Sequence, residues 1–317
     1  MIKKYLLFIF SLNLALGLNA QTRLESTGQI PILAWYSIPA KETTVARYKE
    51  MRDAGITYSF SSFSNADDAA KALDVAEKAD VKIVLSCPEL EKDPEKTVKR
   101  FMNHPALAGY HLRDEPAIQL FPELGNWARK IQSVDNKHYC YVNLFPNFAD
   151  STQLGTKNYK KYVQEYIKQI PVQFVSFDYY PAMKDGIYKN WFDNLELIMR
   201  ESQKAGLPFW AFVLTTNYDK DHVTPQTLAA MRLQAYADLA YGAQGIQYFT
   251  YWSATSVNTP TGEDQRGAPI SVTGKRSVDY DRVQQLSEEI QKLAGDFLGT
   301  KVVSVRHTGW SKIPEGT

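Results

Sequence analysis

Short β-rich runs alternate with longer amphipathic segments along almost the whole chain. Eight runs have the length and the β-branched and aromatic content of strands, and each is followed by a segment with helical spacing of apolar residues. The predicted strands are Pro31–Ser37, Ile56–Phe63, Lys82–Cys87, Leu107–Arg113, His138–Leu144, Phe174–Tyr180, Pro208–Thr215 and Gly245–Trp252. The predicted helices are Thr43–Asp53, Asn65–Lys78, Asp93–Asn103, Gln119–Val134, Lys157–Gln169, Lys189–Ala205, Thr224–Tyr241 and Asp279–Leu298.

Eight alternating strand and helix units predict an α/β fold, a (β/α)₈ TIM barrel over residues 22–299. A doubly wound open sheet is the alternative, but no glycine-rich phosphate loop follows the first predicted strand. After the last predicted helix, Lys301–Arg306 has the composition of a strand with no partner in the barrel. We therefore expect residues 300–317 to form the start of a truncated C-terminal β-module, or a tail.

The N-terminus has the three parts of a secretory signal peptide. Two lysines precede an apolar run from Tyr5 to Leu18, and small residues follow. The run is too short to span a membrane comfortably. We expect cleavage after Ala20, so that residues 1–20 are a signal peptide and the protein is exported to the periplasm or the extracellular space without membrane insertion.

Charge and cysteine content exclude several classes of protein. With 36 basic and 35 acidic residues the net charge is +1, which gives no electrostatic reason to expect binding to nucleic acid. Cys87 and Cys140 lie on the third and fifth predicted strands, about 10 Å apart across the strand between them, so two free buried thiols are expected. Nothing in the sequence indicates an oligomeric state.

Polar residues stand at the ends of several predicted strands, where a barrel has its active site. Asp114 and Glu115 end the fourth strand, Asn143 ends the fifth and Asp178 ends the sixth. Two adjacent carboxyl groups at the tip of a buried strand cost desolvation and mutual repulsion, and such groups gather at functional sites. The structural alternative is a carboxylate that caps the next turn and pairs with Arg113.

Strand alternation predicts which of these side chains point into the barrel. On the fourth strand, Tyr110 and Leu112 suit the helix-facing side, which turns His111, Arg113 and Glu115 inward. The inward residues of the fifth and sixth strands are by the same rule Tyr139, Tyr141, Asn143, Ser176, Asp178 and Tyr180. Three consecutive strands thus direct polar groups into one cavity.

This arrangement of carboxyl groups suggests cleavage of a glycosidic bond, which needs a carboxylic acid and a second group at the anomeric carbon. Glu115 is the expected general acid, and Asp178 is the only inward carboxylate at the end of another central strand. The 19 Tyr, 15 Phe and 6 Trp residues offer stacking surfaces for a carbohydrate substrate. The expected substrate-binding residues are Trp35, Tyr36, His111, Arg113, Tyr141, Asn143, Tyr180 and Trp252.

Other kinds of site lack their sequence signals. The five histidines show no zinc-ligand spacing, and Gly-x-Ser-x-Gly, the usual serine-hydrolase motif, does not occur. We expect neither a metal nor a cofactor.

Five stretches together resemble exported bacterial glycoside-hydrolase-like barrels, distantly related to the β-galactosidase and endoglycanase superfamily. They are Gly109–Pro116, Tyr141–Pro146, Ser176–Pro181, Pro208–Phe212 and Gly245–Trp252. The resemblance implies that Glu115, after the fourth strand, is the acid/base. This sequence departs from the superfamily pattern at Asp114, where the superfamily usually has Asn. It departs again at Leu214–Asp219, which has no match for the glutamate nucleophile that ends the seventh strand in the superfamily.

Three readings of the site follow. Asp178 could supply the second carboxylate, with retention or inversion decided by its distance from Glu115. Alternatively, the pair Asp114 and Glu115 is similar to that of hexosaminidases, in which Asp orients the substrate's acetamido group as nucleophile and Glu protonates the leaving group. Tyr180 would then be a natural acetamide partner. The third reading is a non-catalytic carbohydrate-binding barrel that lost its nucleophile.

Overall fold

The computed structural model describes residues 28–184, 186–188, 190–217, 226–253 and 267–308. The predicted signal peptide lies outside the described residues, as do Thr224 and the end of the chain beyond residue 308. None of the described helices combines the length and the apolar character that crossing a membrane requires.

Within these ranges, eight parallel strands close into a barrel in the order β1-β10-β9-β6-β5-β4-β3-β2, which confirms the predicted fold. The barrel strands are β1 (Ile32–Trp35), β2 (Tyr58–Phe60), β3 (Lys82–Leu85), β4 (Leu107–Asp114), β5 (Tyr139–Leu144), β6 (Val175–Phe177), β9 (Phe209–Leu214) and β10 (Gly245–Phe249). Each matches a predicted strand and is shorter or differs by a few residues at its ends. Two further short strands, β7 (Ala182–Met183) and β8 (Gly186–Ile187), form a separate antiparallel hairpin that the sequence pattern did not indicate.

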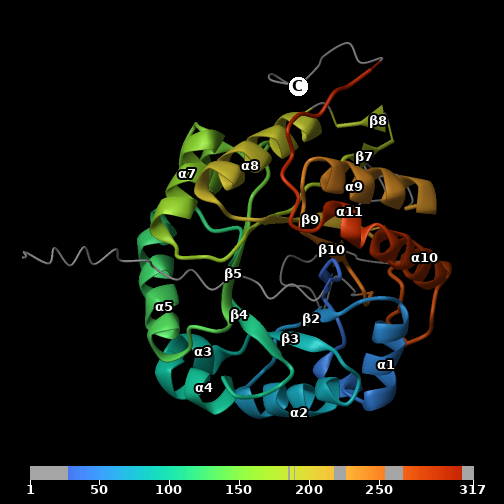
Figure 1. The fold of residues 1–317 in the computed structure, drawn as a ribbon. Coiled ribbons are helices and arrows are strands. Elements are labelled where there is room, and N and C mark those ends of the chain that lie inside the picture. The colour runs from blue at the N-terminus through green and yellow to red at the C-terminus, as the bar shows by residue number, and fades with distance from the viewer. Residues whose placement is uncertain (1–27, 185, 189, 218–225, 254–266, 309–317) are drawn as a thin grey trace, which may run out of the picture.

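Helices surround the barrel, as Figure 1 shows. The longer helices are α1 (Val45–Asp53), α2 (Ala66–Glu77), α4 (Pro94–Phe101), α5 (Phe121–Val134), α7 (Tyr159–Gln169), α8 (Trp191–Ala205), α9 (Leu228–Ala240) and α10 (Val278–Lys292). Shorter ones are η1 (Ala40–Glu42), α3 (Pro88–Lys92), η2 (Ile118–Leu120), α6 (Ser151–Leu154) and α11 (Ala294–Phe297). The predicted helix Asp279–Leu298 is therefore two helices that meet at Leu293.

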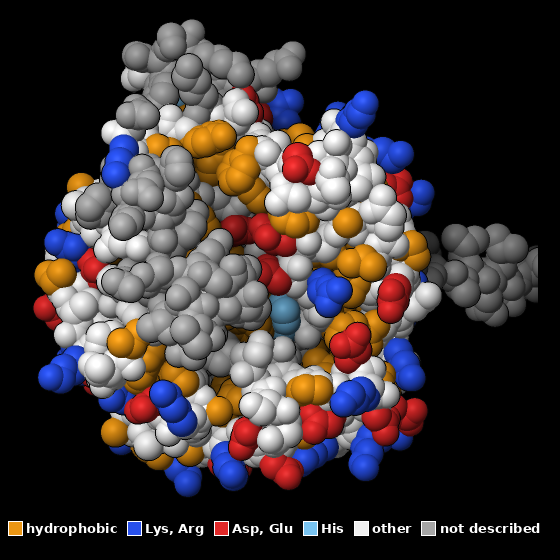
Figure 2. Space-filling view, turned by 180° about the vertical axis from the view of Figure 1, so that it is seen from behind, with side chains coloured by type: hydrophobic (Ala, Val, Ile, Leu, Met, Phe, Trp, Pro, Cys, Tyr) orange, Lys and Arg blue, Asp and Glu red, His pale blue; other side chains and the backbone are white. Residues whose placement is uncertain are grey.

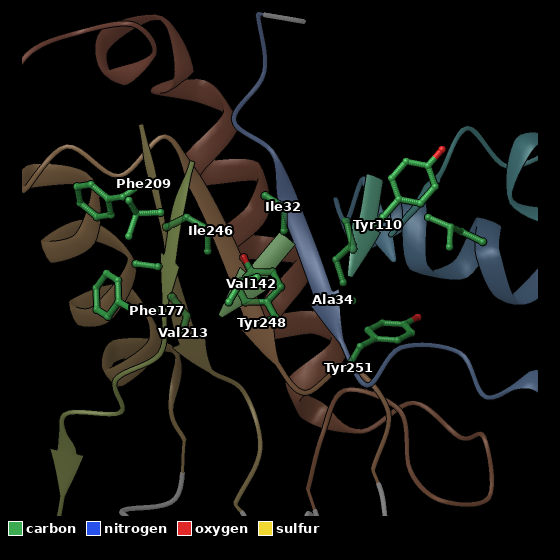
Figure 3. Packing of buried hydrophobic residues seen from close by; sticks show 14 of the residues in the cluster. Ile32, Ala34, Tyr110, Val142, Phe177, Phe209, Val213, Ile246, Tyr248 and Tyr251 are labelled. Atoms are coloured by element: carbon green, nitrogen blue, oxygen red, sulfur yellow. The ribbon is translucent and has the colours of Figure 1, made fainter. Parts of the chain in front are cut away.

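Side-chain alternation along the strands separates two apolar clusters. On β1, Ile32 and Ala34 face the helices, whereas Leu33 and Trp35 lie inside the barrel. Figure 3 shows part of the outer cluster, which includes Ile32 and Ala34 of β1, Val142 of β5 and Ile246 of β10. The inner cluster is mostly aromatic, and it fills the barrel below the strand ends that carry the polar residues.

The predicted strand Lys301–Arg306 is wrong for the described residues, because 301–308 contain no strand. This segment instead follows the helical layer. Gln203 Nε2 of α8 donates to the Val302 carbonyl oxygen at 3.3 Å, and the Tyr241 hydroxyl lies 2.7 Å from His307 Nε2. The alternation of valines that resembles a strand here supplies contacts with the outer cluster through Val302 and Val305, while Val303 is exposed.

Candidate active site

Three carboxyl groups meet at the C-terminal ends of β4 and β6. Asp114 is the last residue of β4, Glu115 follows it, and Asp178 follows β6 directly. Asn143 of β5, the strand between them, donates from Nδ2 to Asp178 Oδ1 at 2.9 Å and to Asp114 Oδ1 at 3.2 Å. The Glu115 side chain hydrogen-bonds to Asp178. We call Asp114, Glu115 and Asp178 the carboxyl cluster.

A chain of hydrogen bonds across the barrel sets the orientation of the Asn143 amide. The Tyr141 hydroxyl donates to Gln247 Oε1 at 2.6 Å, and Gln247 Nε2 donates to Ser176 Oγ at 2.9 Å. The Ser176 hydroxyl donates to Asn143 Oδ1 at 2.8 Å. Because the amide oxygen is engaged in this way, the NH₂ group of Asn143 must face the carboxyl cluster. Each group in this polar chain donates to the next one, and the last donor, the Asn143 NH₂ group, donates to the two aspartates.

The electrostatics of the carboxyl cluster favour protonation. Burial, and then the charge of Asp114, raise the pKa of Asp178 to about 7, while hydrogen bonds including those with Asn143 and Glu115 act in the opposite direction. Burial raises the pKa of Asp114 to about 6, against the lowering effect of Asn143. Asp178 is half-buried, and Asp114 as a whole residue is exposed. A carboxyl group that has protein on most sides and solvent on one side can combine a raised pKa with an exposed residue.

Figure 2 shows a hollow on one face of the molecule, where acidic side chains and a histidine lie together. The backbone of Glu115 is held by a hydrogen bond to β5. Its N–H donates to the Asn143 carbonyl oxygen at 2.9 Å, and its φ of 45° lies in the left-handed region, which is unfavourable for a residue with a Cβ. Glu115 thus has a strained backbone at a site of clustered charge.

His111 lies inside the barrel among aromatic rings. Its ring centroid is 4.5 Å from that of Phe60, 5.6 Å from Trp35 and 5.7 Å from Tyr141. Burial, and secondarily the charge of Arg113, lower the pKa of His111 to about 3, so the imidazole is neutral at physiological pH. Its Nε2 is buried and has no hydrogen-bond partner among the described residues.

Aromatic side chains form one wall beside the carboxyl cluster. The Phe249 ring centroid lies 5.9 Å from Tyr36 and 5.4 Å from Tyr180, and all three rings are half-buried against the inner cluster. Trp35 and Tyr141 are 3% and 1% exposed, so they lie beneath the site as its floor. Tyr36 and Tyr180 are therefore better placed than Trp35 to contact a sugar ring.

Two expected substrate-binding residues do not join this group. Arg113 was expected to point inward, which is wrong, because the pairing of β4 with β5 shifts by one residue between His111 and Arg113. This irregularity aligns Asp114 with the inward-facing Asn143 and leaves Arg113 exposed on the outer side of the strand. Trp252 packs in the outer cluster, with the Arg47 guanidinium 5.2 Å from its ring centroid.

The end of β9, the seventh barrel strand, carries no carboxyl group among the described residues. Thr215 and Thr216 follow Leu214 and are fully buried, and Asn217 Oδ1 accepts a hydrogen bond from the Gln226 backbone. Asp178 is the carboxylate on a neighbouring strand that shares the Asn143 amide with Asp114 and hydrogen-bonds to Glu115. Within the described ranges, no group of three or more His, Cys, Asp or Glu side chains has the arrangement of a metal site.

Sequence reasoning missed Gln247 and Phe249 of β10. Alternation could have found both, because Ile246 and Tyr248 face the helices and Gln247 is then a polar residue on an inward face. Ser176 was expected inside the barrel, but its part in orienting Asn143 depends on contacts between three strands that no local pattern shows.

The fold of this chain is similar to the folds of several solved structures. No family model matches the sequence, and a comparison with curated proteins finds no relative. Among solved structures, a β-galactosidase from Marinomonas ef1 matches with a TM-score of 0.59 and 12% identity, over 84% of this chain and 60% of that one. A candidate α-L-fucosidase from Bacteroides thetaiotaomicron matches with a TM-score of 0.57 and 13% identity, over 82% of this chain and 95% of that one.

Xylanase 10B from Thermotoga maritima is similar as well, with a TM-score of 0.51 and 11% identity, over 84% of this chain and 97% of the xylanase. This chain spans about three fifths of the length of the β-galactosidase. At these identities the likeness shows the barrel fold. The neighbours themselves are glycoside hydrolases.

Proposed function

We propose that this protein is an exported glycoside hydrolase that cleaves an O-glycosidic bond in an oligo- or polysaccharide, with Glu115 as general acid. The observation that carries the proposal is the carboxyl cluster itself, in which Glu115 hydrogen-bonds to Asp178 and both aspartates share the Asn143 amide. A barrel of this architecture has its reaction centre at the same strand ends. The solved barrels that it resembles are named as enzymes that act on sugars.

The contact between Glu115 and Asp178 bears on the second catalytic group. Retaining enzymes keep their two carboxyl groups about 5 Å apart and inverting enzymes about 6.5–9.5 Å apart, so that a sugar ring fits between them. Glu115 and Asp178 are instead joined directly by a hydrogen bond. This supports the hexosaminidase-like reading, with Asp178 supporting Glu115 and Asp114 orienting a substrate acetamido group.

In that reaction Glu115 donates its proton to the leaving oxygen while the acetamido carbonyl oxygen attacks the anomeric carbon. Water then opens the resulting ring, and Glu115 takes a proton back from it. The raised pKa of Asp178 means that the pair holds a proton near neutral pH, which keeps an acid available. Tyr180 stands at the aromatic wall, where it could contact the acetamido group.

The test is hydrolysis of a broad glycan panel that pairs each N-acetylhexosaminide with its 2-hydroxy analogue. Wild type should cleave acetamido substrates only, and a thiazoline analogue of the cyclised intermediate should inhibit it. Glu115→Gln should lower turnover by a factor of about 10³ or more while binding persists. Efficient cleavage of the 2-hydroxy analogues would instead assign the second role to Asp178 acting directly.

The second candidate is a non-catalytic carbohydrate-binding barrel, and the specific observation in its favour is the end of β9, where Thr215 and Thr216 occupy the described positions. Under this alternative, wild type binds a glycan and cleaves none in the panel, and Glu115→Gln leaves the affinity unchanged. N-terminal sequencing of the secreted protein tests the proposed export, with Gln21 expected as the first residue.

A further inference from the structure

A pocket of about 330 Å³ lies on the outer side of β4, away from the carboxyl cluster. Its walls come from α3, the start of α4, the end of β4, η2 and α5. This volume is at the lower end of the range for small-molecule sites. Leu112, which is 5% exposed, and Leu124 form its apolar base.

One aromatic ring in this pocket is held in a fixed position. Trp127 is half-buried, and its Nε1–H donates to the Leu90 carbonyl oxygen of α3 at 3.2 Å. The indole hydrogen is satisfied by the protein, so what the ring presents to the pocket is apolar surface. Such a surface suits the C–H face of a sugar ring.

Polar groups of both signs surround the ring. Lys92, Arg113 and Lys130 share the pocket with Glu91 and Glu123. In the part of the chain that the structure describes, none of these five forms a salt bridge within 4.0 Å. By contrast, Arg129 on the same helix is engaged, since it donates to the Gln169 carbonyl oxygen at 3.1 Å.

This mixture discriminates between kinds of ligand. An anion would meet two carboxylates that repel it, and a cation would meet three positive groups. Neutral hydroxyl groups both donate and accept, so they can use the carboxylates as acceptors and the cations as donors. Together with the Trp127 surface, the pocket matches one unit of a neutral sugar.

Its position relates it to the carboxyl cluster. The irregular pairing within β4 turns Arg113 to the outer side and Asp114 to the inner side, so the two sites lie on opposite sides of one strand tip. We propose that the pocket binds a neutral sugar unit of a glycan, as an accessory site beside the carboxyl cluster. The accessory role rests on the proposed function, whereas sugar binding in the pocket can be measured without it.

The experiment uses full-length protein with ¹⁵N-labelled tryptophan, carrying Glu115→Gln so that substrates persist. The indole N–H signal of Trp127 is identified by its loss in Trp127→Phe. Cello-, xylo-, galacto- and N-acetylchito-oligosaccharides are titrated as neutral probes, and oligogalacturonate as the anionic one. At least one neutral probe should shift the Trp127 signal saturably, while the signal of Trp191, which is 1% exposed, stays in place.

Glu123→Gln should weaken this binding by a factor of about ten, because it removes a charged acceptor from an exposed position. Lys161→Met on α7, also exposed and outside the pocket, is the matched control and should leave the affinity unchanged. If none of the neutral probes shifts the Trp127 signal, the proposal is overturned. A shift with oligogalacturonate alone also overturns it.

Hydrolysis by wild type, measured on the same sugars, separates the two proposals. A saturable Trp127 shift without hydrolysis of any sugar supports the pocket and contradicts the proposed function. Hydrolysis with an unmoved Trp127 signal supports the function and overturns the pocket.

Discussion

Gln247 donates a hydrogen bond from Nε2 to Ser176 Oγ at 2.9 Å, although 71 residues separate them in the chain. This contact connects β10 with β6 and belongs to the polar chain that turns the Asn143 amide toward the carboxylates. It makes Gln247 a positioning residue, since it acts on the carboxyl cluster only through its neighbours.

Gln247→Leu should therefore raise the pKa of Asp178 by about half a unit, because Asn143 is free to turn its NH₂ group away. Carboxyl ¹³C titration of aspartate-labelled protein measures this shift. Gln244→Leu is the matched control, because the Gln244 side chain bonds to the Phe297 carbonyl oxygen outside the barrel. Equal pKa shifts in the two variants would contradict the prediction, because the shift would then not depend on the orientation of the Asn143 amide.

Asp178→Asn should stabilise the protein at alkaline pH. The pKa of Asp178 is raised from 3.8 to about 7, so between these values the folded state binds more protons than the unfolded state, and stability falls as pH rises. Removing the charge should raise the melting temperature at pH 8 by about 3–6 °C and have little effect at pH 4.

Differential scanning calorimetry at the two pH values checks this expectation. Asp296→Asn, at an exposed position of α11, serves as control. A stabilisation by Asp178→Asn that is the same at pH 4 and pH 8 would contradict the linkage to ionisation.

Glu115→Gly should be more stable than Glu115→Ala by about 1 kcal/mol. Both variants lose the carboxyl group, but only glycine adopts a φ of 45° without steric cost. Urea denaturation of the two variants gives the difference. At Ala117, where φ is −65°, replacement by glycine should instead destabilise the protein, and equal stability of the Gly and Ala variants at position 115 would rule out backbone strain there.

The two cysteines should not react with Ellman's reagent at pH 8 in the folded protein. Both are free, Cys140 is 1% exposed and Cys87 9% exposed, and burial raises the pKa of both thiols. Unfolding in guanidinium chloride should release two thiols without a reductant. Fewer than two under those conditions would indicate a disulfide.

Local patterns predicted the barrel because each strand and helix carries its own periodicity. On β5 the alternation correctly separated Tyr139, Tyr141 and Asn143, inside, from Cys140 and Val142, in the outer cluster. The same rule failed at Arg113, because the shift in β4 pairing depends on how that strand meets β5, and the residue pattern there is compatible with regular alternation. It also failed at Lys301–Arg306, where Val302 and Val305 pack against the outer cluster and Val303 is exposed.

The sequence by itself determined the fold class and brought Asp114, Glu115 and Asp178 to one end of the barrel, because parallel strands align their C-terminal ends. Tertiary structure decided how these groups are coupled. The Asn143 amide that both aspartates share, the contact between Glu115 and Asp178, and the support from Gln247 join β4, β5, β6 and β10. Such contacts depend on the closure and register of the sheet, and these are properties of the assembled barrel.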